Sequence, residues 1–198
     1  MASTVDICNQ ALTKLGASRI TSLLDDTKQA RSLNAIFETK RDAELAAHPW
    51  TFAITRAQIP ASSTAPAFGW AKAYPLPAGY LALVEVGEDY VFYQSDAGPL
   101  FQIEGGSILT DEASPLRIRY TQRITNSGLL PALFVEALAC RLAAEVAEDL
   151  TQSLSKRTQA WEEYKQAIRA ARKTNAIEQP PRLPPPASWL RALQDQGG

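Results

Sequence analysis

Residues 41–53 limit the possible folds of this chain most, because they begin with the composition of a helix and end with the pattern of a strand. The first seven of them are mostly good helix formers. Pro49 has no amide N–H to donate and disfavours the α conformation at His48, so the helix must end there. Trp50 and Phe52 then alternate with smaller residues, which is the period of a strand with one buried face. The stretch predicts a structural corner, made by His48, Pro49, Trp50 and Phe52, between a helical and a β-rich part.

The composition is that of an ordinary globular protein, with 198 residues of which 45% are hydrophobic and 21% charged. Lys and Arg number 20 against 21 for Asp and Glu, so a net charge of −1 gives no general reason to bind nucleic acid or an anionic membrane. No apolar run approaches the length of a bilayer, and we expect neither a signal peptide nor a membrane partner. Cys8 and Cys140 lie inside apolar helical patterns, which predicts two buried, reduced thiols.

Charges are distributed unevenly along the sequence. Residues 155–191 contain eight bases and three acids, whereas residues 73–116 contain no Lys or Arg. Two solvated faces would explain this, but opposite patches would also set the register of copies that pack side by side. The acids of residues 73–116 are Glu85, Glu88, Asp89, Asp96, Glu104, Asp111 and Glu112.

Apolar spacing predicts two helices before the corner. Ser3 is a suitable N-cap for the first, with Asp6 in capping-box position and Gly16 as a natural end. Asp25 or Asp26 can cap the second helix, and the short loop predicts an antiparallel hairpin. The apolar stripes are Ile7, Cys8, Ala11, Leu12 and Leu15 in the first helix, and Ala30, Leu33, Phe37 and Leu45 in the second.

Short β runs separated by Gly, Pro and Asp follow the corner up to about residue 125. Their regular spacing predicts a small antiparallel sheet, sandwich or barrel. The runs are residues 80–86, 90–93, 100–103, 107–109 and 116–123. In the last run, Leu116, Ile118 and Tyr120 face one way, and Arg117, Arg119 and Thr121 face the other.

Two more helices are predicted after the β runs. The first covers residues 129–150, with Pro131 in its first turn, and Ser155 can cap a second that ends at about Thr174. Their apolar stripes are Phe134, Leu138, Leu142, Val146 and Leu150, widened by Leu133, Ala137 and Ala144, and then Trp161, Tyr164, Ile168 and Ala171.

The pattern predicts an α+β fold with an antiparallel four-helix core built from both chain ends. The core domain is discontinuous, formed by residues 1–49 and 126–174, and residues 50–125 are an inserted small antiparallel β domain.

Residues 175–198 form an extended Pro-rich C-terminal arm in this interpretation, because their prolines favour polyproline II. A stiff arm with an aromatic anchor is suited to gripping a partner. A disordered tail is the alternative, although such tails are usually poor in aromatic residues. The predicted partner-binding residues are Arg182, Leu183, Pro185, Trp189, Leu190 and Arg191.

The residue types that catalysis needs are scarce. His48 is the only histidine, and its place before a proline favours packing over a catalytic role. The two cysteines and the histidine lack zinc spacing, and Gly105 and Gly106 belong to no phosphate-binding loop. No calcium-loop pattern is present either. The sequence therefore predicts no enzyme, no cofactor and no metal.

The last predicted helix suggests one alternative, a small regulatory DNA-binding protein. Arg169, Arg172 and Lys173 lie close in sequence to Trp161 and Tyr164. These aromatic residues belong to the apolar stripe, however, so they suit a core better than a base-stacking platform. A structural or assembly role agrees with the remaining features.

Several blocks of the sequence, taken in order, resemble a known family. The early blocks are NQALTKLG at residues 9–16, ITSL at 20–23, RD at 41–42 and HPWTFA at 48–53. The later ones are residues 134–142, ACRLA at 139–143, WEEYK at 161–165 and the Pro-rich tail. Together they resemble the tail tubular protein A family, the head-to-tail adaptors (connector proteins) of short-tailed bacteriophages.

The resemblance implies a structural virion protein of the neck, assembled in the host cytoplasm. Its partners would be further copies in a ring, dodecameric in the family, together with the portal protein and the tail nozzle or tube protein. The arm would run onto the portal or a neighbouring subunit, and the β domain would point toward the nozzle. Double-stranded DNA would pass through the channel unread during ejection, and the acids of residues 73–116 would suit a channel wall that repels phosphate. Another phage neck or tail-completion protein is the alternative within this class.

Overall fold

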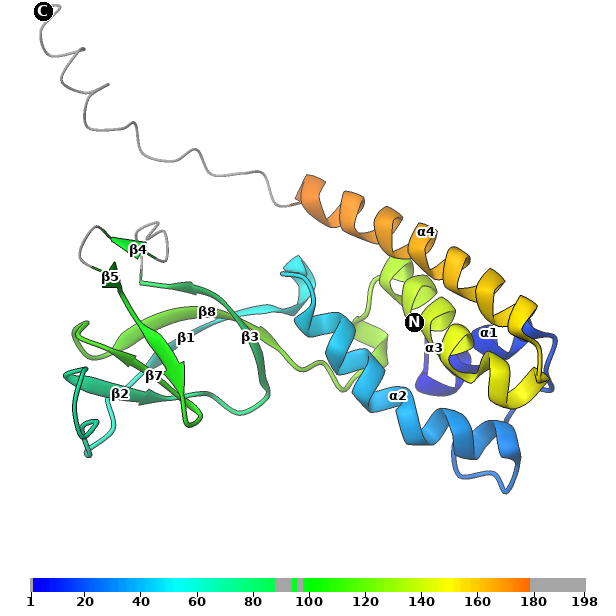
Figure 1. Cartoon of the computed structure of the whole chain (residues 1–198), viewed down its shortest axis with the longest axis horizontal. Coiled ribbons are helices and arrows are strands. Elements are labelled where there is room, and N and C mark those ends of the chain that lie inside the picture. Colours follow the sequence, from blue (N-terminus) through cyan, green and yellow to red (C-terminus); the bar gives the residue numbers. More distant parts are fainter. Residues whose placement is uncertain (1, 88–93, 96–97, 179–198) are drawn as a thin grey trace, which may run out of the picture.

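Two helices, a β-rich stretch and two further helices follow one another along the chain (Figure 1). The structure, a computed structural model, describes residues 2–87, 94–95 and 98–178. The fold is mixed α+β, with four α-helices and two small three-stranded antiparallel sheets among the described residues, which confirms the predicted class. The prolines and anchor residues of the predicted arm lie outside the described residues.

The first helix, α1, spans Thr4–Leu15, and both of its ends are as the sequence predicts. The Ser3 hydroxyl accepts a hydrogen bond from the Asp6 amide, and the Asp6 carboxylate accepts one from the Ser3 amide at 2.9 Å. Gly16 then adopts the left-handed conformation, with φ at 67°, and its N–H reaches the last carbonyls of the helix. The complete predicted stripe of α1 is buried.

The second helix, α2, spans Lys28–Ala46 and is capped by Thr27, whose hydroxyl accepts from the Ala30 amide at 3.2 Å. The prediction that Asp25 or Asp26 caps it is wrong. The Asp25 carboxylate instead accepts hydrogen bonds from the amides of Thr21 and Ser22, at 2.8 and 3.0 Å, and so stabilises the preceding loop.

The third helix, α3, spans Ala132–Thr151 and is the element on which the other helices pack. The first two helices pack mainly on α3 and share few contacts with each other, so they do not form the predicted helical hairpin. Many buried residues of α3 are alanines, whose small side chains let neighbouring helices approach closely. One hydrophobic cluster includes buried residues from all four helices and from the corner. The predicted stripe of α3 is buried except at its two ends, where Leu133 is 43% exposed and Leu150 is partly buried.

The ends of the last two helices differ from the prediction. Leu129 belongs to a short 3₁₀ turn, Ser127–Leu129, and Pro131 is the N-cap of α3. The fourth helix, α4, spans Leu154–Glu178, so it begins earlier and ends later than expected. Ser153 rather than Ser155 supports its first turn, with the hydroxyl accepting from the Lys156 amide at 3.3 Å.

The corner, residues 48–53, differs from the predicted strand because Thr51–Ala53 is a 3₁₀ turn. The strand β1 begins only at Ile54. Trp50 is 1% exposed, and its indole N–H donates to the Glu44 carbonyl at 2.8 Å. Its ring lies edge-on to Phe134, with centroids 5.1 Å apart. The predicted aromatic filling of the corner is therefore present, although the backbone around it is a turn.

Seven residues of β8 form the central strand of the first sheet, whose order is β1-β8-β3. The second sheet has the order β2-β7-β6, and a short ribbon pairs β4 with β5. Every pairing is antiparallel. The predicted run at residues 90–93 lies outside the described residues. The strand bounds are β1 Ile54–Ile59, β2 Lys72–Pro75, β3 Tyr80–Val86, β4 Gln94–Ser95, β5 Gly98–Pro99, β6 Gln102–Glu104, β7 Ser107–Thr110 and β8 Leu116–Gln122.

The two sheets pack face to face around a second hydrophobic cluster. Leu116, Ile118 and Tyr120 of β8 meet Tyr74 and Ile108 of the other sheet, as their alternation predicts. The strand therefore turns Arg117 and Arg119 away from this cluster. Thr121 shares their side of the strand but is buried.

Replacing the corner tryptophan should destabilise the fold. We expect Trp50→Ala to lower the free energy of unfolding by about 3–5 kcal/mol, because it removes a buried aromatic ring and leaves a cavity. Urea denaturation measures this change. Trp70→Ala is the matched control, since Trp70 is only half-buried and lies in a loop. Equal stability of the Trp50→Ala variant and the natural chain would contradict the account of the corner.

Candidate functional site

An apolar groove of about 190 Å³ lies beside the corner. It is formed by the corner, by the start of α3 and by one face of the last turns of α4. Its lining residues are Trp50, Phe52, Pro131, Ala132, Leu133, Phe134, Ala171, Thr174, Asn175 and Glu178. The apolar side chains that reach its surface are those of the half-buried Phe52 and the exposed Pro131, Ala132 and Leu133. The groove therefore has the chemistry of a docking site for an apolar side chain.

Asn175 holds the corner against α4. Its amide oxygen accepts from the Thr51 amide at 2.8 Å and from the Thr51 hydroxyl at 2.9 Å. Its amide nitrogen donates to the Pro49 carbonyl at 3.2 Å and lies 3.1 Å from His48 Nε2. Asn175 belongs to the predicted arm, residues 175–198, yet it lies in α4 and is only 6% exposed, so this part of the prediction is wrong. Its position seven residues after Ile168 continues the apolar stripe and is the signal that could have revealed it.

His48 packs in the corner rather than standing in a catalytic arrangement. Its ring lies edge-on to Trp50, with centroids 4.7 Å apart. Because the Asn175 amide nitrogen is a donor, His48 Nε2 accepts in this contact, which requires the neutral ring. Burial and the nearby positive charge of Arg172 lower the pKa of His48. The four predicted corner residues, His48, Pro49, Trp50 and Phe52, thus lie together, with a structural role.

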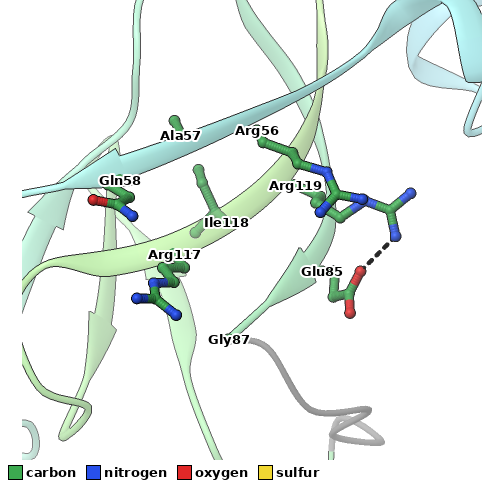
Figure 2. Close-up of a pocket in the computed structure, with 8 residues that line it drawn as sticks. All are labelled: Arg56, Ala57, Gln58, Glu85, Gly87, Arg117, Ile118 and Arg119. Carbon is green, nitrogen blue, oxygen red and sulfur yellow. Dashed lines mark hydrogen bonds and ion pairs between the residues drawn. The ribbon is translucent and has the colours of Figure 1, made fainter.

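An open pocket of about 690 Å³ lies on the outer face of the first sheet and is named here the arginine pocket (Figure 2). Strand register explains how it forms, since Arg56 of β1 and Glu85 of β3 both lie opposite Arg119 of the central strand. Gln58 lies opposite Arg117 in the next row. The complete lining is Arg56, Ala57, Gln58, Glu85, Gly87, Arg117, Ile118 and Arg119.

A short ion pair lies at the centre of the arginine pocket. Arg119 Nη1 is 2.6 Å from Glu85 Oε2, and the two side chains are 19% and 15% exposed (Figure 2). Arg56 lies beside them and is exposed. Guanidinium groups stay charged at all ordinary pH values, so they bind carboxylates or phosphates but do not transfer protons. The chemistry of the lining is therefore suited to contact with an anionic group.

The arginine pocket was not predicted, because residues 73–116 contain acids but no Lys or Arg and their partners come from other strands. In the fold, Glu85 of this block is paired with a base from β8, a strand that begins at residue 116. The charge of the sheet face is therefore mixed. The alternation of Arg117 and Arg119 in the sequence was the one partial indication of the pocket, because it places both side chains on the same face of the strand.

The aromatic residues of α4 do not form a base-stacking surface. Trp161 and Tyr164 are half-buried, and the Arg141 guanidinium of α3 lies 4.6 and 5.2 Å from their ring centroids. The Tyr164 hydroxyl donates to Glu44 at 2.7 Å, and burial, with Glu44 in second place, raises the pKa of Tyr164 to about 12. The bases Arg169, Arg172 and Lys173 are exposed on α4.

Two further kinds of site, for a metal ion and for a membrane, were searched for in the part of the chain that the structure describes. Those residues contain no group of three His, Cys, Asp or Glu side chains that could hold a metal ion. None of their helices combines the length and the apolar composition of a bilayer-crossing segment. Cys8 and Cys140 are both buried and free, as predicted. The predicted contact residues Arg182, Leu183, Pro185, Trp189, Leu190 and Arg191 lie outside the described residues.

No protein-family model matches this chain, and no curated protein matches it significantly.

The environment of His48 predicts an unusual titration. Because the chain has one histidine, its ring signals in an NMR titration report this site alone. We expect a pKa below the ordinary value of 6.5, since the fold favours the neutral ring. The stability that His48 contributes is then complete above pH 6.5 and is lost as the pH falls through the lowered pKa. An Arg172→Gln variant should titrate closer to 6.5, and a pKa of 6.5 or above in the natural chain would contradict the packing.

The ion pair of the arginine pocket predicts a stability effect. Glu85→Gln leaves the Arg119 charge in a poorly solvated place, so we expect the free energy of unfolding to fall by about 1–3 kcal/mol. Thermal unfolding measures the change. Arg56→Gln, at an exposed position of the same pocket, should change stability by less than about 0.5 kcal/mol. Similar effects of the two substitutions would show that the ion pair does not add to the stability of the fold.

Proposed function

We propose that the chain is a head-to-tail adaptor of a short-tailed bacteriophage. As a structural virion protein of the neck, it forms a ring, dodecameric as in the family that it resembles. The ring joins the portal to the tail nozzle or tube and forms part of the channel for DNA ejection. The protein is assembled in the host cytoplasm and has no enzymatic activity.

The observation that carries this proposal is the contact between two separate blocks of the family resemblance. The block at residues 48–53 and the block at residues 134–142 meet where the Trp50 and Phe134 rings lie 5.1 Å apart. Phe52 adds a second edge-on contact with Phe134, at 5.2 Å. Residues that resemble one family and also form one packed unit support a resemblance of the fold, beyond a chance match of short motifs.

The proposal assigns a role to each part of the chain. The helices act as an antiparallel four-helix core that builds the ring and meets the portal. The β insertion points toward the nozzle, where the arginine pocket offers guanidinium groups to carboxylates of the nozzle or of a neighbouring subunit. Acidic residues of the β part keep the DNA from adhering to the channel wall. The extended C-terminal arm runs onto the portal or a neighbouring subunit.

The exposed bases Arg169, Arg172 and Lys173 favour one alternative, a small regulatory DNA-binding protein. Their helix turns its aromatic residues toward α3, so this surface has charge but no stacking platform. Duplex binding that weakens steeply with salt would support the alternative, and no binding at low salt would exclude it.

The arm provides the test of the adaptor proposal. We expect Trp189→Ala to leave the subunit folded but to reduce its assembly on the portal of the same phage at least about tenfold, because an aromatic anchor supplies much of the energy of a small interface. Co-sedimentation with purified portal measures the bound fraction. Trp70→Ala, a tryptophan of the β part, is the control and should bind as the natural chain does. Normal assembly of the Trp189→Ala variant would contradict the assigned role of the arm.

A further inference from the structure

We infer that the apolar groove beside the corner is the docking site for the C-terminal segment, residues 179–198, of a neighbouring copy of this chain, with Trp189 as the anchor. The inference deepens the proposed function and rests on it in one respect, namely that copies of the chain lie side by side in a ring.

The lining of the groove suits an aromatic anchor. The ring of Phe52 is half-buried, and with the exposed Pro131 it offers apolar surface of the kind that an aromatic side chain packs on. Leu133 also lines the groove, and 43% of its surface is exposed although it begins a helix whose other apolar residues are mostly buried. A docked indole ring would cover this side chain.

The rim of the groove supplies polar partners. A buried indole N–H needs an acceptor, and both Thr174 and Glu178 line the groove with exposed oxygen atoms. Glu178 also carries the only negative charge in the lining, which complements Arg182 and Arg191 on either side of the anchor in the sequence. The groove therefore matches the C-terminal segment in both apolar and charged character.

The position of the groove points to the same occupant. Glu178, the last residue of α4, lies in the lining, so the segment of 20 residues that follows starts at the groove itself. This segment contains four large apolar residues, Leu183, Trp189, Leu190 and Leu193. No other part of the chain outside the described residues is long enough to carry both a spacer and an anchor.

The prolines indicate that the groove belongs to a second copy. The segment has prolines at 180, 181, 184, 185 and 186, which favour polyproline II with a rise of about 3.1 Å per residue. Trp189 follows Glu178 by eleven residues, so an extended segment carries the anchor about 34 Å away from the groove at which it starts. A return to the same groove would need a sharp reversal within this stiff run.

Docking of this kind is head-to-tail, and this determines which assemblies can form. The segment of one copy enters the groove of the next, so the two partners contribute different surfaces. Such heterologous contacts form rings when the rotation closes. Repetition of such a contact around a ring makes the assembly strong even when each single contact is weak.

Disulfide cross-linking of the full-length chain tests the inference. Thr174→Cys places a thiol on the exposed rim of the groove, and Ser188→Cys places one beside the anchor. The two natural cysteines are buried and should not react. On mild oxidation of the purified double variant without portal, we expect covalent dimers and larger species on a non-reducing gel.

The matched control pairs Ser188→Cys with Thr158→Cys. Thr158 is an exposed threonine of the same helix, sixteen residues before Thr174 and so about 24 Å away along the axis. We expect the groove pair to give at least about ten times more cross-linked dimer than the control pair, and the addition of Trp189→Ala to remove most of that difference. Equal yields would overturn the inference, because they indicate random collisions. An intramolecular product alone would overturn it as well, because the segment would then occupy its own groove.

This experiment is independent of the portal. If the groove pair fails to cross-link but the chain still assembles on the portal, the groove assignment is wrong and the adaptor proposal stands. If cross-linking succeeds and the chain ignores the portal, copies dock as inferred but the adaptor proposal is wrong.

Discussion

The packing of Trp50 between the two parts of the chain is the interaction on which the rest of the structure depends. Pro49 ends α2. The indole N–H of Trp50 donates to the Glu44 carbonyl, so the residue that follows the helix folds back against the last turn of that helix. The same ring lies against Phe134 of α3, while Asn175 of α4 bonds the backbone next to it. Three helices therefore share one aromatic joint, and the direction in which β1 leaves the helical part is set there.

Beyond this joint, the β part has its own basis for stability. Its two sheets enclose a separate apolar cluster, and the outer face of the first sheet is left to polar residues. Cross-strand register then brings Arg119 and Glu85 together at 2.6 Å and adds Arg56 beside them. An arginine-lined pocket and an apolar groove thus arise in different parts of one chain, and the proposed assembly role with several partners would use both.

Much of the fold can be predicted from signals between residues that are close together in the sequence. Capping by Ser3, the buried stripe of α1 and the alternation in β8 depend on neighbours within a few residues, and all three were predicted. Features that depend on residues far apart in the sequence were not predicted. The 3₁₀ turn at Thr51 follows from its bonds to Asn175, which is 124 residues away, and the arginine pocket follows from the pairing of strands that are far apart in the sequence. The groove could not be predicted either, because it is shared by three elements.

The mass of the purified chain, alone and mixed with the portal of the same phage, tests the adaptor account most directly. Light scattering or native electron microscopy would measure it at micromolar concentration. The account predicts a free subunit that adds to the portal as a closed ring, with one copy for each portal subunit and an open central channel. A chain whose mass stays unchanged in the presence of the portal would contradict the account.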